Sequence, residues 1–237
     1  MSKSVRSDGR ALDELRPMKM KVGVIKRADG SAEVEFGQTR VVAAVYGPRP
    51  IHPKHQEISG RALLRCRYNM LPFSVSDRKK PGYDRRSTEL AKVITEALEP
   101  SVFLEEFPRT VIDIDMEIVQ ADAGTRVAAI NAASLALADA GIPMRDLVSA
   151  VAAGRANGKL MVDLTKEEED ADDAIDLPMA IMSRIGKTTL LQMDGIASAQ
   201  ELESIMALAE EGCKKIYAVQ KQTLIHRYNA DQTQTEA

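Results

Sequence analysis

Cysteine is scarce in this chain of 237 residues, and long apolar runs are missing. Cys66 and Cys213 are too few to form a disulfide framework, and they lack the spacing of metal ligands. No apolar run approaches the roughly 20 residues that a membrane-spanning helix needs, and no secretory signal peptide is recognisable. The sequence therefore predicts a soluble, cytoplasmic protein with no membrane partner.

A large excess of charge of one sign is also missing. The chain has 32 Lys and Arg residues against 35 Asp and Glu residues, which gives a formal net charge of −3. This balance excludes a generally basic coat for nucleic acid, so any contact with RNA or DNA must be local.

The chain also lacks a linker-like stretch long enough to separate independent domains. Its length allows a substantial core, built as one domain or as two intimate halves. We expect a single domain over residues 1–228, followed by a polar tail over residues 229–237 that frays.

Alternating and β-branched segments, separated by turn residues, predict at least three strand pairs. The turn signals are Asp29-Gly30, Asn157-Gly158 and Gly186. Three pairs of strands are expected to flank these turns: 22–25 with 32–36, 147–153 with 160–164, and 181–185 with 188–193. Residues 40–46 form one further β-branched run. A further apolar segment, 177–182, is typical of a buried strand.

Three helices are expected. The first follows Asp84, and the second is an alanine-rich, nearly all-apolar segment that begins at Thr125 and is stopped by Gly141 and Pro143. The third begins at the capping box Ser198-x-x-Glu201 and runs towards Arg227. Together these patterns indicate a mixed α/β (α+β) fold, with helices packed against largely antiparallel sheets.

The junction Gln120-Ala-Asp-Ala-Gly-Thr-Arg126 joins an alternating strand to the alanine-rich helix. A Gly-Thr step at a helix start leaves backbone N–H groups unpaired, and the helix dipole adds partial positive charge there. Arg126 beside it carries a planar, five-donor side chain suited to phosphate. The pattern favours an anion site, although an ordinary turn with a solvated arginine has the same sequence.

Two further segments carry charge next to predicted elements. Asp84-Arg-Arg-Ser87 places Arg85 and Arg86 at a helix N-terminus, where the dipole disfavours cations, so they could hold an external anion or simply reach into water. Residues 167–176 carry seven carboxylates, a pattern usual in solvated loops. Asp176 stands at the edge of the buried strand, where a rigidly held carboxylate could act as a general acid or help to bind a divalent cation.

If residues 60–70 form a strand, three arginines share one of its faces with Asn69. These are Arg61, Arg65 and Arg67. Such a face suits a phosphate backbone, but it could also be solvent-exposed or paired with acids of a neighbouring subunit. A second set of alternating side chains, Asp113, Asp115 and Glu117, is expected to form a solvated face or a subunit seam.

Taken in order, these motifs resemble the RNase PH family of phosphorolytic exoribonucleases. The resemblance rests on Asp84-Arg-Arg-Ser87, the 120–126 junction, and Asp170 followed by Asp176-Leu-Pro178. The opening Arg6-Ser-Asp-Gly-Arg10, with Leu15-Arg-Pro17, is similar to the N-terminal signature of that family. Residues 65–74 and 162–170 resemble most the branch of catalytic ring subunits of archaeal exosomes. The resemblance covers nearly the whole chain, and it implies an RNase PH-like fold.

The resemblance implies a 3′→5′ exoribonuclease in which inorganic phosphate, as co-substrate, attacks the terminal phosphodiester of RNA. Nucleoside diphosphates would leave, and the reverse reaction would add RNA tails. The expected phosphate-binding residues are Arg85, Arg86, Gly124, Thr125 and Arg126, with Arg126 also catalytic. Asp176 is expected to protonate the departing 3′ oxygen. Asp170 is expected to be a cation ligand or an orienting residue, and the two aspartates could together bind Mg²⁺.

The expected partners also follow from the resemblance. Single-stranded RNA is expected to contact Arg67 in the first place, with Arg61 and Arg65 as further candidates. Family members form rings of six, and in an exosome the neighbour is a related, non-catalytic subunit, with RNA-binding cap subunits added. Two alternatives stay open: a homohexameric enzyme that trims tRNA 3′ ends, and a catalytically idle RNA-binding ring subunit.

One position departs from the bacterial homohexameric relatives, which usually carry Gly-Gly-Thr-Arg. Here Ala123 replaces the first glycine. Because alanine adopts positive φ less readily than glycine, the turn is expected to differ from theirs. This departure favours the exosome branch.

Overall fold

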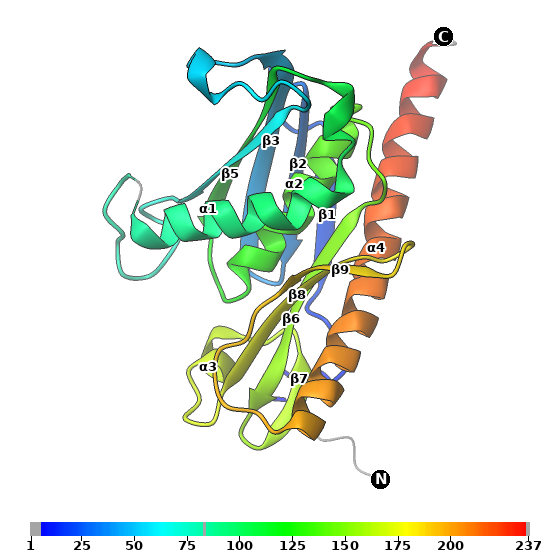
Figure 1. Cartoon of the computed structure of the whole chain (residues 1–237). Helices are drawn as coiled ribbons and strands as arrows, with labels where there is room; N and C mark the ends of the chain where they lie inside the picture. The colour runs from blue at the N-terminus through cyan, green and yellow to red at the C-terminus, as the bar shows by residue number, and fades with distance from the viewer. Residues whose placement is uncertain (1–5, 83, 236–237) are drawn as a thin grey trace.

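The computed structural model describes residues 6–82 and 84–235. Two β-sheets face a central helix (Figure 1). The first sheet has the strand order β1-β2-β3-β5-β4, and the second has the order β7-β6-β8-β9. The strands of the first sheet are β1 (Met18–Val22), β2 (Gly30–Phe36), β3 (Thr39–Pro50), β4 (Leu63–Met70) and β5 (Thr110–Gln120). Those of the second are β6 (Val148–Ala156), β7 (Lys159–Val162), β8 (Ile175–Met182) and β9 (Lys187–Leu191).

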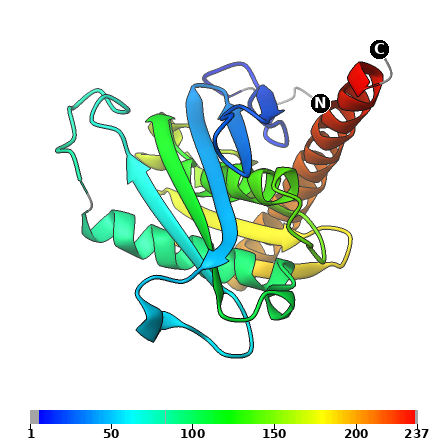
Figure 2. The ribbon, with the colours of Figure 1, turned by 90° about the horizontal axis from the view of Figure 1, so that it is seen from above.

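The pairing within the sheets agrees with the prediction of largely antiparallel sheets. All neighbouring strands pair antiparallel except β4 and β5, which run parallel. A parallel pair needs a long crossover, and here the crossover contains α1 (Arg85–Leu98). Figure 2 shows the loop after β4 extending away from the sheet before the chain returns through α1.

The alanine-rich helix α2 (Thr125–Asp139) lies between the two sheets. It packs against β2 and β3 on one side and against β6 and β8 on the other. All of its residues from Val127 to Leu137 are buried, as its apolar composition predicted. Small side chains let the backbones approach closely: a Cβ at Gly30 would stand 2.3 Å from the carbonyl oxygen of Ala136.

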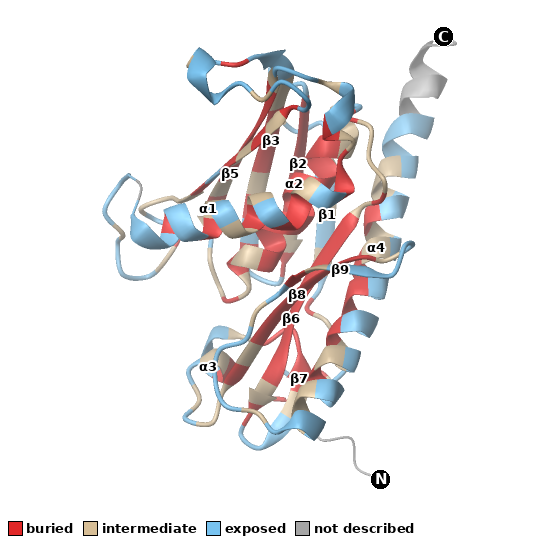
Figure 3. Cartoon of the chain, in the orientation of Figure 1, coloured by how far each residue is buried: buried red, intermediate tan, exposed pale blue. Residues whose placement is uncertain are grey.

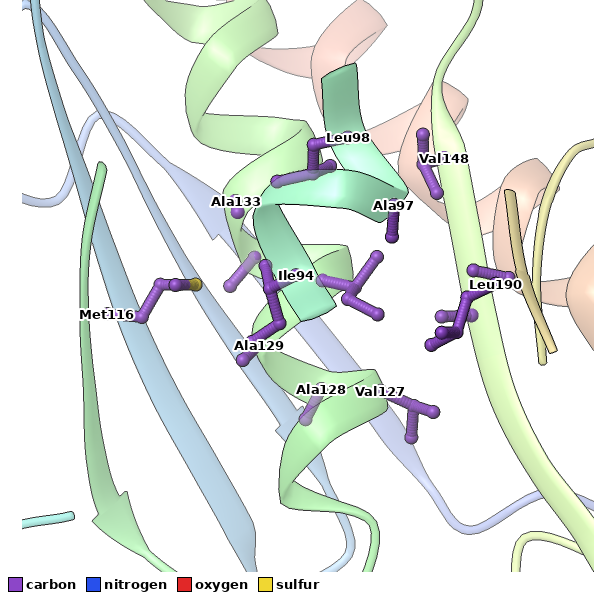
Figure 4. Packing of buried hydrophobic residues seen from close by; sticks show 14 of the residues in the cluster. Ile94, Ala97, Leu98, Met116, Val127, Ala128, Ala129, Ala133, Val148 and Leu190 are labelled. Carbon is purple, nitrogen blue, oxygen red and sulfur yellow. The ribbon is translucent and has the colours of Figure 1, made fainter. Parts of the chain in front are cut away.

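One continuous hydrophobic cluster spans both sheets. Figure 4 shows side chains of α1, α2 and strands of both sheets meeting in it, with Ile94 and Leu98 near Ala129 and Ala133. The longest helix, α4 (Ala199–Thr235), runs along the second sheet and past β1 (Figure 1). Figure 3 shows that α1 and α4 keep exposed faces, whereas α2 is buried. Short helical segments complete the fold: α3 (Lys166–Glu169) and η1 (Lys54–Gln56), η2 (Glu99–Ser101) and η3 (Leu104–Glu106).

Several element boundaries differ from the sequence prediction. The expected strand 181–185 is cut short, because β8 ends at Met182 and residues 183–186 form the turn before β9. The first strand is Met18–Val22 and pairs with β2, whereas 22–25 was expected, so residues 23–29 form a longer connection. Helix α4 continues to Thr235, although a frayed tail was expected from Asn229. Residues 236–237 of that tail lie outside the described residues.

The capping box at Ser198 is present, with Ser198 and Glu201 exchanging hydrogen bonds. Across the described ranges, no helix combines the length and apolar character needed to cross a membrane.

Candidate functional site

The turn between β5 and α2 has two successive residues in the left-handed conformation. Ala123 has φ 57° and Gly124 has φ 62°. The left-handed region costs a non-glycine residue roughly 1–2 kcal/mol. Ala123 nevertheless adopts it, although alanine does so less readily than glycine. The surrounding structure must therefore hold the turn, which we define as residues 121–124.

Among the described residues, no side chain caps the start of α2. Gly124 is the N-cap residue and offers no side chain to the first turn of the helix. The hydroxyl of Thr125 accepts a 2.8 Å hydrogen bond from the hydroxyl of the buried Tyr68. The helix therefore presents its dipole and its first backbone N–H groups without a carboxylate or hydroxyl of its own cap, which is the arrangement that binds anions.

A cavity of about 500 Å³ opens at this helix start. A second cavity of about 340 Å³ adjoins it and shares six of its lining residues. The shared residues are Arg86, Arg126, Lys166, Glu169, Asp176 and Pro178. Gly124 and Thr125 line the larger cavity. The larger cavity thus brings together all but two of the residues predicted for the reaction centre.

Those two residues are Arg85 and Asp170. Arg85 is exposed and lines neither cavity among the described residues, whereas its neighbour Arg86 lines both. Successive helix positions point about 100° apart, so the two adjacent arginines face different directions. Asp170 lines the smaller cavity, but its side chain is 60% exposed and pairs with Lys166 at 2.5 Å.

Arg126 and Asp176 each carry a buried polar atom with no hydrogen-bond partner in the described chain. These atoms are Arg126 Nε and Asp176 Oδ1. Another nitrogen of Arg126, Nη1, donates to Gln192 at 2.6 Å. An unpaired buried polar group costs about 1–3 kcal/mol, so such groups in a native protein call for a ligand or another explanation. Here they line the same cavities, as a ligand site requires.

The backbone of Asp176 is fixed on both sides. It lies opposite Gly154 in the β6–β8 pair, and its N–H and C=O bond to Asp194 at 3.0 and 2.8 Å. A Cβ at Gly154 would come within 1.7 Å of the Ile175 carbonyl oxygen, so this register tolerates only glycine. Burial, together with the charge of Asp194, raises the pKa of Asp176, while Arg126 and Arg86 act in the opposite direction. A raised pKa suits a general acid.

Glu169 belongs to the site and was not predicted. It lines both cavities and receives a backbone hydrogen bond from Gly124. Burial, with the charge of Asp176, raises the pKa of Glu169 to about 7. In the sequence Glu169 is one of seven carboxylates within residues 167–176, and nothing in that segment distinguishes the one that packs against the turn. Tyr68, Lys166 and Gln192 were missed for the same reason, because each reaches the site only through the tertiary fold.

The described residues do not form a ready metal centre. They contain no group of three or more His, Cys, Asp or Glu residues that could hold a metal ion. Of the two predicted Mg²⁺ ligands, Asp170 is exposed and already paired with a lysine. We therefore derive no step through a metal.

The arginine face of β4 is paired within the chain. In the parallel register, Arg65 lies opposite Asp113 and Arg67 opposite Asp115. Each arginine Nε donates to its opposite carboxylate at 2.5 Å. Asn69 donates to Glu117 in the same way, while Arg61 pairs separately with Glu99 at 3.3 Å. We call the β4–β5 side chains at 65, 67, 69, 113, 115 and 117 the paired strip.

The paired strip corrects the interpretation of the acidic strand. Asp113 is not on a solvated face: it is 1% exposed and also pairs with Arg49. Arg65 and Arg67 pair with acids of the same chain. The arginine side chains are still 37–49% exposed, so a nucleic acid can reach them.

Comparison with known families gives two matches that follow each other along the chain. Residues 14–143 match domain 1 of the 3′ exoribonuclease family RNase PH, and residues 146–212 match domain 2. Domain 1 corresponds to the first sheet with α1 and α2, and domain 2 to the second sheet with the start of α4.

Similar proteins include archaeal exosome subunits. Exosome complex component Rrp41 of Thermococcus onnurineus is 59% identical over 94% of this chain and 89% of its own length. The protein of the same name from Methanopyrus kandleri is 54% identical over 96% of this chain and 95% of its own length.

Solved structures agree on the fold. The crystal structure of rice Rrp46 has a TM-score of 0.83 and 26% identity, and covers 92% of this chain and 99% of that one. A chain of the Archaeoglobus fulgidus exosome with RNA bound to the active site has a TM-score of 0.75 and 22% identity. The match covers 90% of this chain and 91% of that one. At that identity the second likeness shows the fold alone. The RNase PH-like, mixed α+β fold predicted from the sequence is confirmed.

Proposed function

The chain belongs to the RNase PH family of 3′ exoribonucleases, and from this premise we propose that it shortens RNA from the 3′ end by phosphorolysis. The observation that carries the proposal is the meeting of Arg86, Arg126 and the uncapped start of α2 around one cavity that also contains Asp176. Two cationic side chains and a helix N-terminus suit two anions held side by side. Phosphorolysis requires this arrangement, because a phosphate ion must approach a phosphodiester.

In the proposed reaction an oxygen of inorganic phosphate attacks the phosphorus of the last phosphodiester. A new P–O bond forms while the bond to the 3′ oxygen of the preceding nucleotide breaks. Arg86 and Arg126 offset the negative charge of the two phosphates, and the α2 N-terminus orients the attacking ion. Asp176 gives its proton to the departing 3′ oxygen. The products are a nucleoside diphosphate and an RNA shorter by one nucleotide, and the same groups serve the reverse reaction.

We propose further that the chain is the catalytic subunit of an archaeal exosome ring. The archaeal relatives named as exosome components support this, since they are more than half identical over nearly the whole chain. The proposed partners are single-stranded RNA, a related non-catalytic ring subunit and RNA-binding cap subunits. The intact set of Arg86, Arg126 and Asp176 argues against an idle ring component.

The test is purification of the chain alone and together with a candidate partner subunit, with ring size and RNA shortening measured for each. We expect shortening only when inorganic phosphate is present, with nucleoside diphosphates as products. Monophosphates formed in phosphate-free buffer would indicate hydrolysis and contradict the proposal. A homohexamer that is fully active without a partner would favour the tRNA-trimming alternative.

A further inference from the structure

Arg16, in the N-terminal signature Leu15-Arg-Pro17, reaches the 121–124 turn from a distant part of the chain. It is 5% exposed, and its Nη1 donates to the carbonyl oxygen of Asp122. Its Nη2 is also close to the turn, because a Cβ at Gly124 would stand 3.1 Å from that atom. Arg16 therefore contacts the turn without lining either of the cavities at the site.

Asp163 anchors the guanidinium of Arg16. Its two carboxylate oxygens accept from Arg16 Nη2 at 2.7 Å and from Arg16 Nε at 3.0 Å, and one of them also accepts from the Arg16 backbone at 2.7 Å. Asp163 is 3% exposed and has φ 55°, another non-glycine residue in the left-handed region. A planar guanidinium held by two parallel bonds has one orientation, so Arg16 presents its Nη1 to the turn in a fixed direction.

Thr39 holds the same turn from the other side. It is fully buried, and its hydroxyl accepts from the backbone N–H of Asp122 at 2.9 Å. The same hydroxyl lies 2.8 Å from the carbonyl oxygens of Asp122 and Ala123, to either of which it can donate. Two side chains from separate segments thus bond to the backbone just before the α2 N-terminus.

We propose that Arg16 and Thr39 are positioning residues for inorganic phosphate, holding the 121–124 turn in the shape that aims the start of α2 at the cavity. The inference rests on the proposed function, because it concerns the affinity of that site for phosphate. Neither residue is placed to touch the ion. Both act through Ala123 and Gly124, whose paired left-handed conformations need external support.

The test compares steady-state phosphorolysis over a range of phosphate concentrations, using the assembly in which the wild type is active. Arg16→Lys keeps the charge but cannot bond Asp163 and Asp122 together. Thr39→Val keeps the shape but loses the hydroxyl. We expect each to raise the KM for phosphate by about 10- to 100-fold, since misplacing a binding group by about 1 Å has effects of that size. The Kd for RNA without phosphate should stay at the wild-type value.

Two matched controls separate positioning from general damage. Arg10 also bonds Asp163, at 3.1 Å to its carbonyl oxygen and at 3.4 Å to its carboxylate, but none of its bonds in the described chain reaches the turn, so Arg10→Lys is the control for Arg16→Lys. Thr110 bonds a backbone carbonyl at the far end of β5, so Thr110→Val is the control for Thr39→Val. Partial unfolding lowers the active fraction and hence kcat, while KM is unchanged. The controls should therefore keep the wild-type KM for phosphate.

The outcomes are distinguishable. A wild type whose RNA shortening does not depend on phosphate would contradict the proposed function itself. A wild type that saturates with phosphate, with both variants keeping its KM, would overturn the positioning role alone. If Arg16→Lys does not fold, Thr39→Val decides, and a KM equal to that of Thr110→Val would count against the inference.

Discussion

Two arginine-rich regions of this protein differ in how their charged side chains are partnered. At the cavity, Arg126 Nε and Asp176 Oδ1 are buried without partners in the described chain. Along the paired strip, Arg65 and Arg67 bond directly to carboxylates of the next strand. Desolvating a polar group without a partner is costly, so the first arrangement is suited to a ligand and the second to the fold itself. A count of arginines does not distinguish the two regions, whereas the location of their partners does.

The largest expected effect is at the proposed acid. Asp176→Asn keeps size and hydrogen-bonding capacity but removes the proton that the 3′ oxygen would take. Turnover should fall by about 10²–10⁴-fold with RNA affinity largely kept. Single-turnover kinetics at saturating RNA, beside binding measurements, would show this. Asp170→Asn is the companion variant: if it abolishes turnover while Asp176→Asn does not, the acid is Asp170.

The neighbouring arginines of α1 give the next contrast. Arg86 lines both cavities and Arg85 lines neither, although the sequence assigned both to phosphate. Arg86→Ala, like Arg126→Ala, should remove about 2–4 kcal/mol of transition-state stabilisation. Arg85→Ala should stay close to the wild-type kcat/KM. Equal losses for the two variants would mean that the helix presents both side chains to the substrate.

A smaller effect is expected on the paired strip. Arg67→Ala should weaken RNA binding and lower its salt dependence by about one phosphate contact, with the chemical step unchanged. The variant also removes the partner of Asp115, whose negative charge then repels RNA. Part of the loss of RNA affinity should come from this repulsion. Salt-titrated binding of Arg67→Ala with and without Asp115→Asn separates the two. If Arg67→Ala slows chemistry as much as Arg126→Ala and leaves binding intact, the division between the regions is wrong.

The smallest effect concerns acid stability of the paired strip. Burial alone would raise the pKa of Asp113, but Arg65 and Arg49 overcome it and lower the pKa below 3.8. A carboxylate whose pKa is lower in the folded than in the unfolded state stabilises the fold at pH values above its unfolded-state pKa. This contribution disappears as pH falls through its folded-state pKa. The Tm of Asp113→Asn should therefore fall less steeply than that of the wild type as pH drops below about 4.

Glu117 on the same strand supplies a control of opposite sign. Burial, with the charge of Asp115, raises its pKa above 4.5, although Asn69 opposes this. Ionising Glu117 then disfavours the folded state, so its contribution to stability falls as pH rises from about 4.5. Glu117→Gln should change the Tm profile in the direction opposite to Asp113→Asn. Profiles that move in the same direction would contradict the assignment of these shifts.

The sequence by itself determined much of the fold and the centre of the candidate site. Local periodicity and turn chemistry identified α2, the β6–β7 hairpin and the capping box at Ser198, because those signals depend on neighbours in the chain. Ordered motifs identified the family. The 120–126 junction pointed to the anion site, since an uncapped Gly-Thr helix start is a local property.

Only the tertiary structure decided which charges face the cavity. Arg85 and Arg86 are equivalent in the sequence, and the rotation of α1 against β4 separates them. Glu169 is one of several carboxylates until α3 packs against Gly124, where burial raises its pKa to about 7. The partners of Asp113 lie 48 and 64 residues away, so strand order and register selected them. Burial and pairing arise from contacts between distant segments, and they set the free energy of each charge.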